Sequence, residues 1–136
     1  MDLNAFSRFA ELHEEVDRAL DATMLALATP SRLLDGRLTG PLCRRNGLST
    51  LYLVVTARDE VRARRLASRD GQTVSEATKG MHDREESERV RYLRFYGIDL
   101  SREEPDFVVD ASDLPPEVVS DRLVEFVRSR SSGSTP

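Results

Sequence analysis

One apolar run in the middle of the chain constrains the fold more than any other feature. Residues 50–56 (TLYLVVT) are almost continuously apolar. In segments on both sides of them, apolar residues recur every three or four positions, as in helices. A strand that is apolar on both faces is typical of a parallel sheet covered by helices. We therefore expect this segment to be a buried strand of an α/β domain.

In the rest of the chain, segments with helical patterns also alternate with segments typical of strands. Thr73 and Glu76 form a capping box, and Gly71 and Gly97 are typical of helix ends. The expected elements are helices at residues 3–12, 14–28, 59–69, 73–96 (with Gly80 as the point where it would bend) and 117–128, strands at 32–35 and 106–110, and a loop punctuated by Gly40-Pro41 and Asn46-Gly47. The pattern predicts one domain over residues 1–128 with a mostly parallel sheet, followed by a flexible tail at 129–136.

Composition excludes several classes of protein. The net charge of −4 lacks the basic excess of a general nucleic-acid binder. Cys43 is the only cysteine, so no disulfide forms within the chain. His13 and His82 lack a second histidine or cysteine at ligand spacing, so we expect no zinc site. Without a leader-like start or a long apolar run, we expect a cytoplasmic protein with no membrane or nucleic-acid partner.

A stripe of charge marks the longest expected helix. Arg84, Glu88 and Arg91 stand at i, i+4 and i+7, so their side chains share one face. Two guanidinium forks can grip a phosphate while the carboxylate between them holds a sugar hydroxyl. Because residues 82–89 include no apolar side chain, we expect this part to pack poorly and to act as a mobile lid. The alternative is a merely solvated helix.

Other charged residues on the helices predict stabilisation of the surface. Glu85 and Arg89 are spaced for an i, i+4 ion pair. Arg62, Arg65 and Arg69 also share a face. We expect that face to be solvated and salt-bridged, and a place near a nucleotide is the alternative.

A second candidate site follows the expected strand at 32–35. Asp35, Gly36 and Arg37 stand at its carboxyl end, where open α/β sheets bind ligands. Asp35 could order a water on Mg²⁺, and Arg37 could reach a base or a phosphate. A turn with an exposed arginine is the alternative.

Five segments, taken in order, resemble cytidylate kinase, especially its short archaeal form. The lid-like helix followed by YGID is the most specific segment, and the others gain weight from being collinear with it. These segments are residues 6–11 (FSRFAE), 16–21 (VDRALD), 35–40 (DGRLTG), 84–99 (REESERVRY to YGID) and 106–112 (DFVVDAS).

The resemblance implies a P-loop nucleoside-monophosphate-kinase fold, a three-layer α/β/α arrangement that transfers the ATP γ-phosphoryl group to CMP or dCMP with Mg²⁺. It also implies residue roles. Arg37 would contact cytosine, Arg84 and Arg91 would hold the acceptor phosphate and the transferring group, and Glu88 would bind the ribose. Asp35 would lie near Mg²⁺. Such chemistry depends on positioning and charge neutralisation.

One departure from the family is large. The chain contains no G-x-x-x-x-G-K motif, so the family's first strand, phosphate loop and first helix have no counterpart. Enzymatic activity is therefore expected only if the missing module lies elsewhere in a longer protein or on a partner, and a homodimer or another partner would then supply the strand. The alternative is a degenerate, non-catalytic paralogue that binds nucleotides or proteins, or a helical scaffold for acidic partners.

Overall fold

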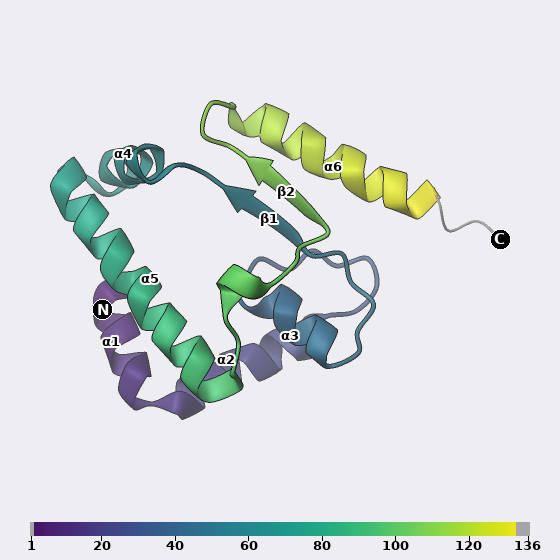
Figure 1. The fold of residues 1–136 in the computed structure, drawn as a ribbon, viewed down its shortest axis with the longest axis horizontal. Helices are drawn as coiled ribbons and strands as arrows, with labels where there is room; N and C mark the ends of the chain where they lie inside the picture. Colours follow the sequence, from purple (N-terminus) through teal and green to yellow (C-terminus); the bar gives the residue numbers. More distant parts are fainter. Residues whose placement is uncertain (1, 133–136) are drawn as a thin grey trace.

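The computed structural model describes residues 2–132 as helices arranged around a small parallel sheet (Figure 1). In the described part, no helix is both long and apolar enough to cross a membrane. The elements in chain order are α1 (Leu3–Leu12), α2 (Glu14–Leu27), α3 (Thr39–Arg45), β1 (Leu53–Thr56), α4 (Asp59–Asp70), α5 (Val74–Tyr96), the short 3₁₀ helix η1 (Leu100–Arg102), β2 (Phe107–Asp110) and α6 (Pro116–Ser132).

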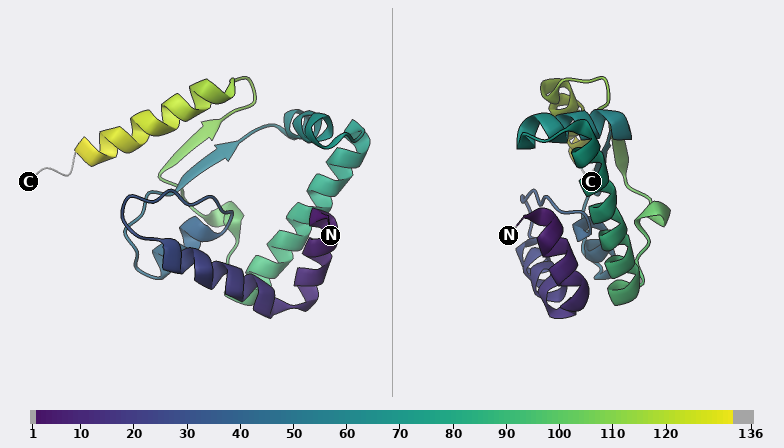
Figure 2. Two further views of the ribbon diagram at one scale, coloured as in Figure 1. Left: turned by 180° about the vertical axis from the view of Figure 1, so that it is seen from behind. Right: turned by 90° about the vertical axis from the view of Figure 1, so that its left-hand side faces the viewer.

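The sheet has two strands among residues 2–132. β1 and β2 run parallel in a register that sets Leu53 opposite Phe107 and Thr56 opposite Asp110. The ring of Phe107 stacks on Phe126 of α6 at a centroid distance of 4.5 Å. α6 therefore covers the face of the sheet to which Phe107 belongs, and Figure 2 shows it lying alone on that side.

Local signals explain the boundaries of α5. Thr73 accepts from the backbone N–H of Glu76, and the Glu76 side chain accepts from the backbone N–H of Thr73. At the other end Gly97 adopts φ 67°, a left-handed conformation that glycine reaches without steric cost. The helix is continuous through Gly80.

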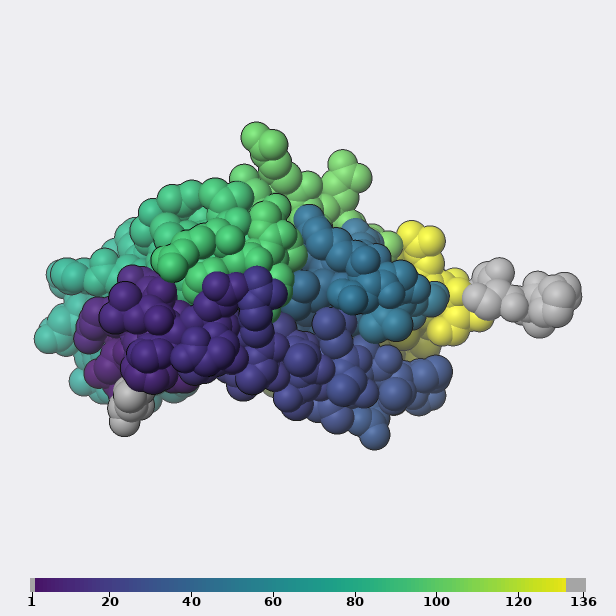
Figure 3. All heavy atoms as spheres, turned by 90° about the horizontal axis from the view of Figure 1, so that it is seen from below, coloured from purple at the N-terminus to yellow at the C-terminus, as the bar shows by residue number. Residues whose placement is uncertain are grey.

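The apolar core lies where α5 meets the first half of the chain. Leu38, Leu42, Tyr92 and Ile98 form one buried cluster. α1 packs along α5, and α2 packs against α3. Seen from below, α1 and α2 lie in front of α5 (Figure 3). This cluster therefore joins helices to one another and contains no strand residue, although Val109 of β2 is buried elsewhere.

Several of the expected elements differ from the structure. Residues 32–35 form no strand, because no neighbouring strand lies beside them among the described residues. The loop expected around Gly40-Pro41 is instead α3, held by the burial of Leu42. Strand 50–56 is shortened to Leu53–Thr56, and its expected burial on both faces is wrong, since Val55 is 52% exposed.

The expected end of the last helix is also wrong. α6 continues to Ser132, so the first residues of the predicted flexible tail are helical. Residues 133–136 lie outside the described part of the chain.

Candidate functional site

Glu88 is the centre of a charged cluster between α5 and the loop before α3. Its side chain is buried, and Arg37 Nε lies 2.5 Å from its Oε2 atom. Arg84, one turn earlier on α5, has Nε 3.7 Å from Glu88 Oε1. Two cations from different parts of the chain therefore converge on one buried carboxylate.

Arg91 forms a second part of this cluster, one turn further along α5. Its Nε lies 2.8 Å from Asp17 Oδ2 of α2, and both side chains are less than a tenth exposed. Arg91 Nη1 also donates to the Ser7 carbonyl of α1 and to Ser87 Oγ, each at 3.1 Å. One guanidinium thus joins α1, α2 and α5.

Burial dominates the electrostatics of this cluster. Burial raises the pKa of Glu88, and Arg37, Arg84 and Arg91 partly oppose that rise. Burial likewise raises the pKa of Asp17 against the opposing charge of Arg91. For both carboxylates, burial raises the pKa by more than the neighbouring arginines lower it. Such a net cost of desolvation is usual for buried ion pairs.

Four charged atoms in the cluster lack a well-formed hydrogen bond. Each lies within 4 Å of an oppositely charged atom but forms no hydrogen bond with it. These buried atoms are Asp17 Oδ2, Arg84 Nε, Glu88 Oε2 and Arg91 Nε. Since native proteins satisfy nearly all buried polar atoms, this concentration singles the cluster out as a functional candidate.

A polar pair flanks the cluster at the end of α5. Tyr96 donates its hydroxyl to Asp21 Oδ2 at 2.6 Å, and Arg18 lies over the Tyr96 ring at 5.2 Å. Burial raises the pKa of Asp21, while the hydrogen bond from Tyr96 opposes this rise. Asp21 therefore adds a third desolvated carboxylate beside Asp17.

A hollow of about 630 Å³ adjoins the Glu88 cluster. Asp35, Gly36 and Arg37 form part of its lining, and β1 forms another part. Glu85 of α5 also lines it and pairs with Arg62 of α4. The hollow thus lies between the arginine cluster and the sheet.

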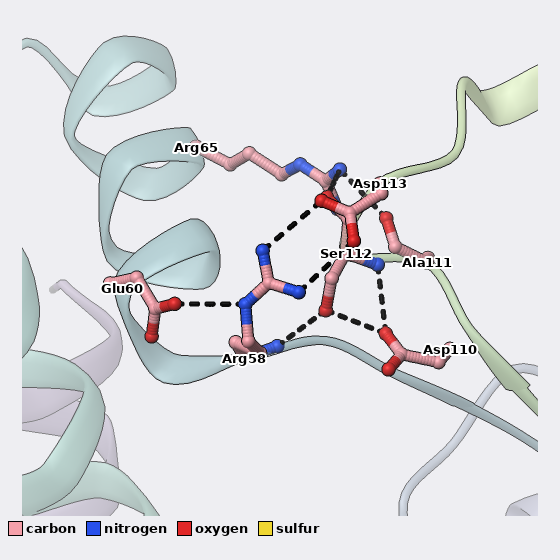
Figure 4. A network of polar contacts seen from close by, with 7 residues as sticks. All are labelled: Arg58, Glu60, Arg65, Asp110, Ala111, Ser112 and Asp113. Atoms are coloured by element: carbon pink, nitrogen blue, oxygen red, sulfur yellow. Dashed lines mark hydrogen bonds and ion pairs between the residues drawn. The ribbon is translucent and has the colours of Figure 1, made fainter.

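The carboxyl ends of the strands are tied together by a separate network, shown in Figure 4. The Arg58 guanidinium, just after β1, donates to both carboxylate oxygens of Asp113 at 3.1 Å. The backbone N–H of Arg58 donates to Ser112 Oγ at 2.8 Å, and Ser112 in turn donates to Asp110. All these groups have protein partners, so this network holds the strand ends and the start of α4 in place.

The structure brings four of the five expected site residues together: Arg37, Arg84, Glu88 and Arg91. Asp35 lies at the rim of the hollow, and the described residues give it no ion pair or hydrogen bond. The expectation that the polar part of α5 packs poorly is wrong at Ser87 and Glu88, which are buried, as is Arg91 one turn after Glu88. That this part acts as a mobile lid stays a prediction.

Sequence reasoning missed the residues that hold Arg91. Asp17 and Ser7 lie about 75 to 85 positions from it, and only their place in the segments 6–11 and 16–21 hinted at a role. The expected Glu85–Arg89 pair is also wrong, since Glu85 pairs with Arg62 and Arg89 with Glu86.

The arginines on α4 are largely engaged, as expected for a salt-bridged face. Arg62 pairs with Asp59 and Arg69 with Asp70. Arg65 instead donates to the carbonyl of Ala111 at 2.8 Å. For the described residues, no group of three or more His, Cys, Asp or Glu side chains is placed to hold a metal ion.

These features define a parallel α/β chain with a buried arginine–carboxylate cluster beside a hollow. The chain is 36% identical over 121 residues to cytidylate kinase of Pyrococcus abyssi, 39% over 116 residues to that of Pyrobaculum arsenaticum, and 37% over 115 residues to that of Methanocaldococcus jannaschii. The matches cover 82–88% of this chain and 62–65% of those proteins. The chain is a relative of the cytidylate kinases, as the motifs predicted, and spans less than two thirds of the length of these curated relatives.

Two further comparisons found nothing. No family model matches the chain, and no solved structure matches it. The relationship therefore rests on sequence identity to the archaeal enzymes.

Proposed function

We propose that the chain binds a cytidine monophosphate, CMP or dCMP, in the Glu88 cluster. The observation that supports this most is the convergence of Arg37, Arg84 and Arg91 on Glu88 beside an open hollow. A nucleoside monophosphate matches this chemistry. Its phosphate suits guanidinium groups, and its sugar hydroxyls suit a carboxylate. The names of the relatives point to the same substrate class.

The proposed roles are those that the resemblance implies, and the position of each side chain supports them. Arg37 reaches the cluster from the rim of the hollow and would contact the cytosine ring. Glu88 would hold the ribose, and Arg84, with its unsatisfied Nε, would hold the phosphate. Arg91 is now engaged by Asp17, so it would bind phosphate only by changing partner.

The proposal extends to phosphoryl transfer from ATP to the bound monophosphate. This reaction needs ATP, Mg²⁺ and a three-layer P-loop fold. Asp35 fits a magnesium role, because Mg²⁺ is commonly held by one or two carboxylates, its own waters and substrate phosphates. The ion would neutralise charge on the transferring group. A phosphate loop would have to come from a longer form of the protein or from a partner.

The alternative is a non-catalytic nucleotide-binding or interaction module. It is favoured by the absence of a glycine-rich phosphate motif from the 136 residues. Formation of CDP from CMP and ATP by this chain alone would overturn it. CMP binding without turnover would support it.

Thermal unfolding with CMP, dCMP, AMP or ATP plus Mg²⁺, each added alone, tests the proposal. A ligand at 100 times its Kd stabilises the folded state by about 2.7 kcal/mol, so CMP or dCMP should raise Tm. ATP should not, because no phosphate loop is present to bind its β and γ phosphates. No shift with any nucleotide would contradict nucleotide binding.

Two matched variants test the site within α5. Arg84→Ala should weaken CMP binding roughly 10- to 100-fold, the usual cost of losing a charge-assisted hydrogen bond. Arg89→Ala removes an exposed arginine that pairs with Glu86 on the same helix, so CMP affinity should stay unchanged. Equal affinities in the two variants would refute the phosphate role of Arg84.

A further inference from the structure

Arg91 is held away from the hollow by contacts within the chain. Its side chain is buried, its Nε lies 2.8 Å from Asp17 Oδ2 of α2, and its Nη1 donates to the Ser7 carbonyl of α1 at 3.1 Å. Arg37 lines the hollow, but in the described part of the chain Arg91 does not. A ligand in the hollow therefore meets Arg91 only if Arg91 leaves Asp17.

The Asp17–Arg91 contact is an ion pair without a hydrogen bond. Asp17 Oδ2 and Arg91 Nε are both buried, and neither atom forms a hydrogen bond. Burial raises the pKa of Asp17 by more than the charge of Arg91 lowers it. A phosphate is a stronger partner for a guanidinium group, because it carries roughly two negative charges and can accept a pair of parallel N–H bonds. An incoming phosphate can therefore compete with Asp17 for Arg91.

Two other contacts join α2 to α5 beside this pair. Tyr96 donates its hydroxyl to Asp21 Oδ2 at 2.6 Å, and Arg18 Nη2 donates to the Phe95 carbonyl at 3.1 Å. Asp21 stands one turn after Asp17 on α2, so these contacts lie next to the ion pair and do not involve it. The guanidinium can thus change partner while the two helices stay together.

We propose that Asp17 is a latch on the phosphate site, a carboxylate that holds Arg91 until the phosphate of a bound nucleotide replaces it. The inference rests on the proposed function, because it takes Arg91 as a ligand of that phosphate. Asp17 is then a positioning residue, since it acts through Arg91 and does not touch the nucleotide.

The latch weakens every ligand of Arg91 by the same factor. A ligand that needs Arg91 binds only the fraction of molecules in which the Asp17 pair is open, so its apparent affinity falls by that fraction. The factor does not depend on the rest of the ligand, so it is the same for CMP and for inorganic phosphate. This property separates the latch from any contact with cytosine or ribose, which inorganic phosphate lacks.

A purely structural role for the pair predicts the opposite effect on binding. If the Asp17–Arg91 pair only held the helices together, Asp17→Asn would lower both the free energy of unfolding and the affinity for CMP. The latch predicts that the free energy of unfolding falls while the affinity rises. The sign of the change in affinity therefore decides between the two roles.

Calorimetry of the full chain with CMP and with inorganic phosphate tests the latch. Asp17→Asn keeps the shape of the side chain and removes its charge, so both affinities should rise by about tenfold or more, the usual contribution of one contact with a charged group. Glu14→Gln neutralises an exposed carboxylate of α2 that pairs with Arg18, and should leave both affinities unchanged. If Asp17→Asn bound CMP no better, or bound CMP better but phosphate no better, the latch would be wrong.

The same change in an Arg91→Ala chain separates the latch from simple repulsion by Asp17. Without Arg91 there is no guanidinium to release, so Asp17→Asn should no longer raise either affinity. A gain that persists would show that Asp17 only repels phosphate, and would refute the latch.

Failure of the latch and failure of the proposed function give different results. If the unaltered chain binds CMP and Asp17→Asn binds it no better, the latch fails and the proposed function stands. If neither chain binds CMP, both fail. Binding by Asp17→Asn alone would support the latch, because the pair would then keep the site closed in the unaltered chain.

If Asp17→Asn does not fold, NMR of the unaltered chain decides the matter. Saturation with CMP should shift the Arg91 Nε–H resonance, because its partner changes from a carboxylate to a phosphate. The Arg89 Nε–H resonance is the control, since Arg89 pairs with Glu86 on the exposed face of α5 and should stay in place. An Arg91 resonance that does not move at saturating CMP would disprove the exchange of partners.

Discussion

At the scale of single residues, the molecule depends on buried charge to join its helices. Arg91 contacts three helices through Asp17, Ser7 and Ser87. Removing one partner of such a pair leaves the other charged and desolvated, which costs far more than losing an exposed pair. The Asp17–Arg91 pair should therefore govern how α1, α2 and α5 hold together.

Asp17→Ala should lower the free energy of unfolding by about 3–5 kcal/mol, because Arg91 would stay buried without its counter-ion. Urea denaturation measures this change. Glu86→Ala removes a carboxylate from an exposed pair with Arg89 and should change the stability very little. If the two variants lowered the free energy of unfolding by similar amounts, the buried Asp17–Arg91 pair would not be what holds α1, α2 and α5 together.

The pH dependence of stability should report Glu88. Because burial raises the pKa of Glu88 above its ordinary value of 4.5, the folded state holds this proton more tightly than the unfolded state. The stabilisation is complete below pH 4.5 and is lost as pH rises through the raised pKa of the folded state.

Glu88→Gln isolates this effect, because glutamine keeps the shape of the neutral side chain. The stability of the parent chain relative to Glu88→Gln should fall as the pH is raised from 4 to 7, in urea titrations at each pH. A constant difference would show that the pKa of Glu88 is not raised.

At the scale of elements, the ends of a helix can depend on a few adjacent residues, whereas a strand forms only beside a partner from a distant part of the chain. The capping box of α5 and the left-handed Gly97 were predicted from a few adjacent residues. α3 was missed because its Gly40-Pro41 pair is typical of a turn. Its burial against α5 and Ile98 outweighs that preference. Residues 32–35 form no strand because a strand requires a neighbour.

Gly40 marks a close approach between α3 and the start of β1. A Cβ atom there would lie 2.2 Å from the Tyr52 ring, so Gly40→Ala should destabilise the chain by about 1–3 kcal/mol. In a Tyr52→Ala background the same change should cost almost nothing, since the clashing ring is gone. Additive losses in a double-mutant cycle of thermal unfolding would contradict this contact.

At the scale of the whole molecule, stability should be uneven. The buried cluster links α5 to α3, whereas none of the α6 side chains that the structure describes is buried, and β1 pairs with one strand only among residues 2–132. Regions with few buried apolar contacts open at a lower free energy than the core. The sheet and α6 should therefore be the least stable part of the chain.

Native-state hydrogen exchange measures this difference directly. Amides in the middle of α5 should exchange about tenfold or more slowly than those of α6. Uniform protection across α5 and α6 in the isolated chain would show that the molecule unfolds as a single unit.

By itself the sequence determined where α5 begins and ends, the α/β alternation and the spacing that sets Arg84, Glu88 and Arg91 on one face. Each depends on interactions between residues a few positions apart. Only the tertiary structure decided that this face is buried, because its charges are neutralised from Arg37 and Asp17, far away in the chain. It also decided how many strands form, since each strand depends on a partner contributed by a distant segment.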